Sequence, residues 1–208
     1  MAPLWPGVTD PAWFSFLLYL LVFEFADYWL HRGQHRFRCW WALHALHHSQ
    51  RHMTMWTDNR NHLLDDVLRA VAMATLARLV GVEPGQCFAL VVATRMLEGL
   101  AHANARIGFG TALDRVLVSP RFHRLHHAAG DGGAQALPAD PQAHNFAVLF
   151  PLWDMLFGTA RFDRHYGATC IADQWLHWGG RSYGEGFWQQ QRLGLARLRD
   201  ALAPRRRS

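Results

Sequence analysis

Three sets of closely spaced histidines constrain this chain more than any other feature of its sequence. They are His31-Arg-Gly-Gln-His35, His44-Ala-Leu-His47-His48 and, far downstream, His123-Arg-Leu-His126-His127. On an α-helix, residues i, i+3 and i+4 share one face, so each set can present its imidazoles together. Neutral imidazole is a common protein ligand of iron, zinc and copper. The spacing therefore predicts that these histidines bind metal and are not separate solvated or capping residues.

Two further positions extend this pattern. Glu98 and His102 repeat the i, i+4 spacing, so His102 is a ninth candidate ligand, while Glu98 is left open as a ligand, an outer partner or a neighbour of Arg95. Asp27 lies one helical turn before His31 and is expected to accept the ring N–H that His31 does not use for metal. One ion cannot use eight or nine imidazoles, whereas two ions can, and the count therefore predicts a two-metal site.

The composition argues against several other classes of protein. The basic residues are all Arg and are spread along the chain, which argues against a nucleic-acid-binding surface. Cys39, Cys87 and Cys170 are scattered and lack the spacing of a disulfide framework or a thiolate metal site, and they fit a reducing compartment. No basic segment precedes the first apolar run, so no cleaved signal peptide is expected.

Apolar segments predict a membrane-embedded helical protein. The first helix is expected from Pro11 through Leu30, and its rise from Trp13 to His31 is roughly 27 Å, close to the thickness of the hydrocarbon core of a bilayer. Apolar segments at 63–82 and 86–103, separated by a tight turn, are predicted as weaker spans because they contain Arg69, Arg78 and Arg95. A short helix is expected to begin at Ser119-Pro120 and to end near Gly130.

The distribution of arginine predicts the orientation. The first twelve residues and the turn at 81–86 contain no Arg, whereas residues 31–62 and the chain after 104 contain many. Because cytoplasmic segments carry the excess of basic residues, the N-terminus and the turn are expected outside. All the histidine sets then lie on the cytoplasmic side, and a bacterial inner membrane is the expected location.

Several motifs together resemble the fatty acid hydroxylase superfamily, also called the sterol desaturase family. Over about residues 24–160 they occur in the family's order: Asp27-Tyr-Trp-Leu-His31-Arg-Gly-Gln-His35, Trp41-Ala-Leu-His44-Ala-Leu-His47-His48-Ser49, His102-Ala-Asn104, Ser119-Pro-Arg-Phe-His123-Arg-Leu-His126-His127 and Leu152-Trp-Asp-Met-Leu-Phe-Gly-Thr159. The resemblance implies an integral-membrane non-haem di-iron oxygenase that acts on lipids. It implies nine iron ligands, which are His31, His35, His44, His47, His48, His102, His123, His126 and His127.

The resemblance also suggests Asp27, Asn104 and Asn145 as catalytic residues. Asn145 matches the Asn of a family Asn-aromatic-Gly motif, although Ala147 stands here in place of the Gly. Family members usually have more apolar helices before the first histidine set. Three histidines have no family counterpart, and the roles of His62 and His144 are open; the three are His52, His165 and His177.

The expected protein is a single all-α domain over residues 1–208, a membrane-embedded helical bundle with a cytoplasmic di-metal cap. It is expected to hold two iron ions, with zinc as a substitute in isolated protein, and to hydroxylate or desaturate a membrane lipid with O₂. No haem, flavin or ferredoxin motif occurs, so electrons are expected from a separate cytochrome b5-like protein, ferredoxin or flavoprotein reductase. The alternatives are a metal transporter, which would place its ligands near mid-bilayer, and a di-zinc membrane hydrolase.

Overall fold

The protein is built from α-helices joined by short irregular segments. A computed structural model describes residues 12–128, 143–163, 167–171, 183 and 186–203. Within these ranges the α-helices are α1 (Ala12–Arg36), α2 (Arg38–His48), α3 (Leu63–Val80), α4 (Pro84–Ala101), α5 (Pro120–His126), α6 (Leu152–Leu156) and α7 (Phe187–Leu202). Two 3-10 turns, η1 (Thr57–Asn59) and η2 (Leu113–Arg115), complete them, and the only β pairing among the described residues is one bridge between Ala128 and Thr169. The predicted all-α class is confirmed.

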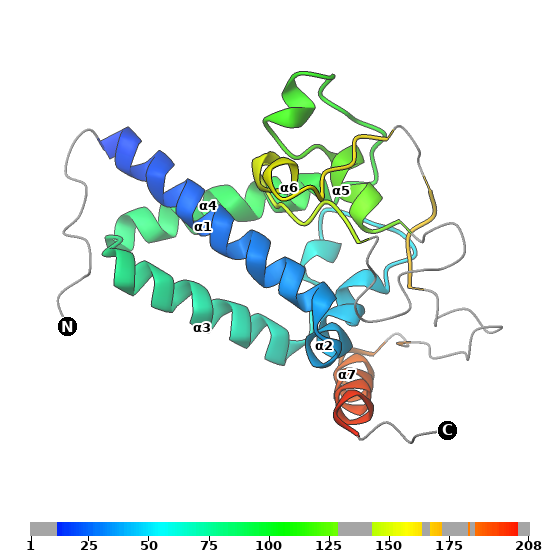
Figure 1. Cartoon of the computed structure of the whole chain (residues 1–208). Helices are drawn as coiled ribbons and strands as arrows, with labels where there is room; N and C mark the ends of the chain where they lie inside the picture. The colour runs from blue at the N-terminus through cyan, green and yellow to red at the C-terminus, as the bar shows by residue number, and fades with distance from the viewer. Residues whose placement is uncertain (1–11, 129–142, 164–166, 172–182, 184–185, 204–208) are drawn as a thin grey trace.

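The three longest described α-helices, α1, α3 and α4, form the layer that supports the histidines. α3 and α4 make a hairpin whose arms diverge from their turn, and α1 lies across them (Figure 1). Gly81 ends α3 with a φ of 81°, a conformation that glycine adopts without strain, and Pro84 occupies the first turn of α4. The predicted segments at 63–82 and 86–103 agree with α3 and α4 to within two residues at each end, whereas α1 continues to Arg36, six residues past the predicted end at Leu30.

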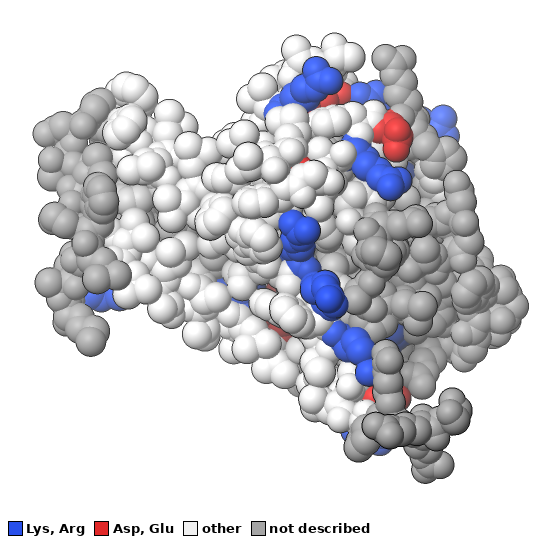
Figure 2. Space-filling view, in the orientation of Figure 1, with Lys and Arg blue, Asp and Glu red and all other residues white. Residues whose placement is uncertain are grey.

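The apolar character of this layer is unevenly distributed. Of the described helices, α1 is the one long and apolar enough to cross a membrane, with a mean hydropathy of 1.3 over Trp13–Arg36. α3 and α4 contain charged residues and do not meet this criterion of length and apolar composition. Their outer surfaces nevertheless carry exposed apolar side chains such as Val71, Phe88 and Met96. Figure 2 shows that basic side chains gather on the half of this face that carries α2 and α5, while the half over the start of α1 is mostly uncharged.

An irregular segment, residues 145–149, is buried between α1, α4 and α5. Asp154 at the start of α6 accepts the backbone N–H groups of Phe146 and Ala147, at 2.9 and 2.7 Å. Glu24 of α1 accepts the N–H of Leu149 at 2.8 Å, and the carbonyl of Leu149 accepts the N–H of Val118. Buried backbone groups outside a helix need such partners, and these acidic side chains supply them.

The C-terminal helix braces the end of the histidine cap. α7 packs against α2, and Figure 1 views it almost end-on beside that helix. Its residue Gln191 accepts the N–H of Leu63 at 2.8 Å and offers its own carbonyl to Nε2–H of His62 at 3.0 Å. The Nδ1 atom of His62 in turn accepts the N–H of Leu64 and caps α3. His62, whose role the sequence left open, therefore joins α7 to the start of α3.

A close approach at Gly194 generates a test of this joint. A Cβ atom there would overlap the imidazole of His62, whereas a Cβ at Gly85, in the first turn of α4, would meet nothing within 4 Å. We expect Gly194→Ala to lower the unfolding free energy by about 1–3 kcal/mol, as overpacked buried sites do. Gly85→Ala should be neutral or slightly stabilising.

Thermal and denaturant unfolding of the purified variants would measure both effects. In a His62→Ala background the cost of Gly194→Ala should shrink, because the two substitutions act on the same contact. Equal stability of the Gly194→Ala and Gly85→Ala proteins would show that the contact between Gly194 and His62 is not tightly packed.

Candidate metal centre

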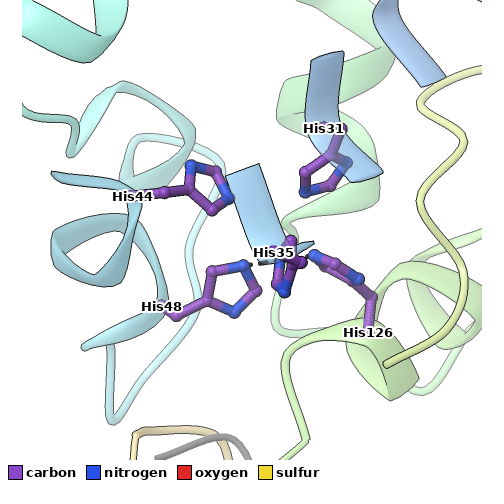
Figure 3. Close-up of side chains that lie close together, drawn as sticks. All are labelled: His31, His35, His44, His48 and His126. Carbon is purple, nitrogen blue, oxygen red and sulfur yellow. Dashed lines mark hydrogen bonds between the residues drawn. The ribbon is translucent and has the colours of Figure 1, made fainter. Parts of the chain in front are cut away.

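Nine buried imidazoles converge in two groups at one end of the bundle. In each group, one nitrogen per ring lies within 4.8 Å of the corresponding nitrogen of every other member. The first group is His31, His35, His44, His48 and His126; the second is His47, His102, His123 and His127. Figure 3 shows the rings of the first group pointing toward a common centre from α1, α2 and α5. All nine side chains are buried, so the groups form the interior of the cap.

Each of the two HxxHH motifs gives its i and i+4 histidines to one group and its i+3 histidine to the other. On α2 the i and i+4 residues, His44 and His48, enter the first group, while the i+3 residue His47 enters the second. On α5 the two groups are exchanged: His123 and His127, the residue that caps the helix, enter the second group, and His126 enters the first. Each helix therefore contributes a pair to one group and a single ring to the other. The sequence predicted a shared face but not this division.

Backbone carbonyls determine which nitrogen of three rings faces its group. Nδ1 of His31 lies 2.7 Å from the carbonyl oxygen of Phe146, and Nδ1 of His126 lies 2.8 Å from that of His144. Nδ1 of His102 lies 2.9 Å from the carbonyl oxygen of Glu98. A carbonyl only accepts, so Nδ1 carries the proton and Nε2 keeps a lone pair.

A carboxylate orients a fourth ring. Nδ1 of His44 lies 3.1 Å from Oδ2 of Asp65, in the first turn of α3. The other oxygen of Asp65 accepts from Gln34 at 2.9 Å and from the indole N–H of Trp40 at 2.7 Å. Both oxygens of this buried carboxylate are used, so it is held firmly against His44. Such carboxylate–histidine pairs fix the tautomer of a metal ligand and raise its basicity.

The ring nitrogens that face the centres suit metal ions. Nε2 atoms of His47 and His123 lie 3.2 and 3.1 Å from Nε2 of His102, which bears no proton. Nε2 of His48 lies 3.2 Å from Nε2 of His126, and the Nε2 atoms of His31, His35 and His44 are buried without a hydrogen-bond partner. Buried nitrogens without partners are costly unless something binds them. The converging lone pairs fit one metal ion in each group.

Burial favours the uncharged form of five of these rings. It lowers the pKa of five imidazoles well below the ordinary value, and neighbouring imidazoles lower it further; they are His47, His48, His123, His126 and His127. A neutral imidazole is the form that binds a metal ion, since protonation removes the lone pair. The cap therefore presents ligands that need no deprotonation at neutral pH.

Carboxylates and two arginines form a polar wall beside the rings. Arg69 of α3 donates to Asp27 of α1 and to Glu98 of α4, at 2.8 Å between its Nε and Oδ1 of Asp27 and 2.7 Å to Glu98. Arg95 donates to the other oxygen of Glu98 at 3.2 Å and pairs with Asp58, whose Oδ1 lies 3.5 Å from Nδ1 of His102. The carboxylates, Arg69 and five of the rings line a cavity of about 50 Å³, which holds only a few small molecules; the rings are those of His31, His44, His47, His102 and His123.

Glu98 combines two of the roles that the sequence left open, whereas Asp27 has a partner that the sequence did not predict. Both side-chain oxygens of Glu98 are paired with arginines, and its carbonyl orients His102, so it is an outer partner of the site. Asp27 was expected to accept the free ring N–H of His31. This interpretation is wrong, because that N–H binds the carbonyl of Phe146 and the helix turns Asp27 toward Arg69 on α3.

The two predicted catalytic asparagines have hydrogen-bond partners other than the rings of the two groups. Asn145 is fully buried with a φ of 59°, accepts the N–H of Arg161 and donates to the carbonyls of Phe122 and Arg161. It therefore holds the entry to the buried segment that contains Phe146. Asn104 is exposed and accepts from Arg124 at 3.1 Å. A catalytic role for either residue stays a prediction.

The remaining histidines do not join the groups where they are described. His52 is exposed, His62 contacts α7, and His144 contributes its backbone carbonyl to His126. His165 and His177 lie outside the described residues, as does most of the loop predicted at 128–143. α5 ends at His126, earlier than the predicted end near Gly130.

Comparisons with known proteins agree with this geometry. Residues 16–159 match the family model described as "Fatty acid hydroxylase". The ornithine lipid hydroxylase OlsE of Rhizobium tropici is 29% identical over 158 residues, which are 74% of this chain and 44% of that protein. Alkylglycerol monooxygenase of Danio rerio is 29% identical over 151 residues, 72% of this chain and 31% of the relative.

A plant relative gives a similar result. Delta(7)-sterol-C5(6)-desaturase of Nicotiana tabacum is 27% identical over 162 residues, 74% of this chain and 54% of that protein. The chain thus spans about a third to a half of the length of these relatives. No solved structure matches the chain. The resemblance expected from the sequence is confirmed, and the matched residues include both histidine groups.

The division of α5 between the groups generates a stoichiometric prediction. We expect two metal ions per wild-type chain. His126→Ala should lower the content toward one by opening the first group, and His123→Ala should do the same through the second. His52→Ala, which alters an exposed ring, should keep both ions. Plasma mass spectrometry of purified proteins measures the content, and an unchanged content in both α5 variants would contradict the assignment.

The contact between Asp65 and His44 generates a second prediction. Asp65→Asn preserves the size of the side chain but removes its charge, and we expect metal affinity to fall about 10–100-fold. Asp66→Asn is the matched control, since Asp66 lines the same cavity with no ring hydrogen bond described for it. Competition with a chelator would measure both affinities, and equal values would reduce Asp65 to a packing residue.

Proposed function

Because the chain belongs to the fatty acid hydroxylase family, we propose that it is a membrane-bound di-iron oxygenase that hydroxylates or desaturates a lipid with O₂. The observation that carries the proposal is the pair of buried, converging imidazole groups. The names of the relatives, which include a lipid hydroxylase, a monooxygenase and a sterol desaturase, support oxidation of a lipid as the reaction class.

Iron is the metal that fits both the imidazole ligands and the proposed oxidation with O₂. Imidazole ligands suit iron, zinc and copper alike, so the rings alone do not select among them. Hydroxylation and desaturation with O₂ require a metal that changes oxidation state, and zinc does not. When bound, two iron ions supply the oxidising power needed to break an unactivated C–H bond.

The residues of the chain position the ligands and maintain their charge state. The carbonyls of Phe146, His144 and Glu98 and the carboxylate of Asp65 hold four rings with Nε2 directed inward. Neutral ligands leave the charge of the metal ions uncompensated, and the surrounding carboxylates offset it. Because the rings are buried, bulk water is kept from the site of oxidation.

The location and partners of the protein follow from the same proposal. The family is membrane-bound, and α1 is suited to anchor the cap to a bilayer, here the bacterial inner membrane with the histidines on the cytoplasmic side. A separate cytochrome b5-like protein, ferredoxin or flavoprotein reductase would supply electrons. The substrate would be a membrane lipid whose hydrocarbon part reaches the histidine cavity.

Growth under ¹⁸O₂ tests the proposal. Cells expressing the wild-type protein should contain a lipid that carries one labelled oxygen or lacks two hydrogens, detected by mass spectrometry of the lipid extract. Cells expressing His126→Ala at equal abundance should lack that product. An unchanged lipid profile together with altered cellular metal content would instead support a metal transporter. Purified protein that contains zinc and consumes no O₂ with a chemical reductant would support a hydrolase.

A further inference from the structure

A second cavity lies where α3 and α4 diverge. Its volume is about 300 Å³, larger than that of the histidine cavity, and α1 closes its inner side. One end is apolar and is lined by residues of all three helices, namely Phe23, Met73, Ala74, Cys87, Leu90 and Val91. The apolar end stops at the α3–α4 turn, where Val80 and Val82 pack against Leu90 and α1. We call this cavity the slot.

The other end of the slot is charged and adjoins the histidines. Asp27, Asp66, Arg69 and Glu98 line both the slot and the histidine cavity. The bridge from Arg69 to Asp27 and Glu98 ties α3 to α1 and α4 at this junction. The slot therefore leads from an apolar end to the wall of the metal centre, with the width of the junction set by one guanidinium and two carboxylates.

The slot is long and opens to the side. Its lining extends from Asp66 to Ala74 on α3 and from Cys87 to Glu98 on α4, roughly 12 and 16 Å along the two helices. Ala70, Ala74 and Val91 at its rim are exposed, and the neighbouring surface carries exposed apolar side chains, among them Val67, Val71, Phe88, Val92 and Met96. Exposed apolar side chains gathered beside a cavity suit contact with a ligand or a membrane.

We propose that the slot binds the hydrocarbon chain of the lipid, with the tail at the Ala74–Cys87 end and the carbon to be oxidised at the Arg69 end. This inference rests on the proposed function. The chain enters sideways between α3 and α4, and its polar group lies beyond the Arg69 end, at the junction with the histidine cavity. Oxidation then falls near the polar end of the lipid, while the apolar end of the slot limits the length of the chain.

Arg69 is a positioning residue in this arrangement. Its three hydrogen bonds are made to carboxylates of α1 and α4, so it fixes the distance of α3 from these helices at the charged end of the slot. The small side chains of Ala70 and Ala74 leave room on the α3 side. These two positions are one helical turn apart, roughly 6 Å, and a large side chain at each would block the slot at a different depth.

Binding without turnover tests the proposal. Full-length protein loaded with zinc, which does not support oxidation, is kept in amphipol so that no detergent chain competes. The probes are tritiated 1-O-hexadecylglycerol, 1-O-octylglycerol and a sterol. We expect Ala74→Phe to weaken binding of the sixteen-carbon ether about tenfold or more, since several methylenes lose their apolar surroundings, and to leave the eight-carbon ether unaffected.

Two further variants make the comparison quantitative. Ala70→Phe should weaken binding of both ethers, because it blocks the slot nearer its charged end. Val71→Phe adds the same side chain to an exposed position of α3 that does not line the slot, and should bind both ethers as the wild type does. Two zinc ions per chain in every variant would show that the substitutions leave the fold intact.

The outcomes separate this proposal from the proposed function. Equal binding of the long ether by Ala74→Phe and Val71→Phe, or a preference for the sterol over both ethers, would overturn the slot. Length-selective binding without any O₂-dependent lipid product in cells would leave the slot in place and overturn the oxygenase. A product of unchanged chain length in cells expressing Ala74→Phe would leave the oxygenase and overturn the slot.

Discussion

The hydrogen bonds that fix one nitrogen of each oriented imidazole also hold distant parts of the chain together. His31 of α1 binds the carbonyl of Phe146, and His126 of α5 binds that of His144. These carbonyls are in position because Asp154 and Asn145 hold the buried segment by its backbone. The ligand geometry and the path of an irregular segment thus depend on each other. Loss of the segment would leave ring N–H groups buried without partners.

Charge balance accounts for the polar wall around an otherwise apolar interior. Imidazole ligands bring no negative charge to the two groups, so two divalent ions would bring four positive charges into a buried site. Asp27, Asp58, Asp65 and Glu98 are buried near the rings, and Arg69 and Arg95 pair with some of them. Buried carboxylates are costly by themselves, and the arginines pair with them and hold them in place. The same network ties α3 to α1 and α4, so one set of charges serves both the site and the helix layer.

Periodic features of this chain could be read from its sequence, and contacts between distant residues could not. Helical spacing identified all nine converging histidines, and the apolar runs located α3 and α4 to within two residues and the start of α1 to within one. The end of α1 was placed six residues too early, because its last turns are polar. Asp65 was missed because 21 positions separate it from His44, and no local pattern links an acid in the first turn of α3 to a ring on α2. Asp27 was assigned to the wrong partner for a similar reason, since helical spacing places it near His31 but cannot show Arg69 on another helix.

The division of the two HxxHH helices between the groups has a structural consequence. Residues i and i+4 approach one centre and residue i+3 the other, so α2 and α5 each contact both centres. A small rotation of either helix would then move ligands of both ions, and the two sites cannot be adjusted separately. This coupling gives α7 its importance, because it packs on α2 and, through Gln191 and His62, on the start of α3 that holds Asp65. α7 lies beyond the residues that match the family, yet it braces both the helix that carries His44 and the carboxylate that orients that ring.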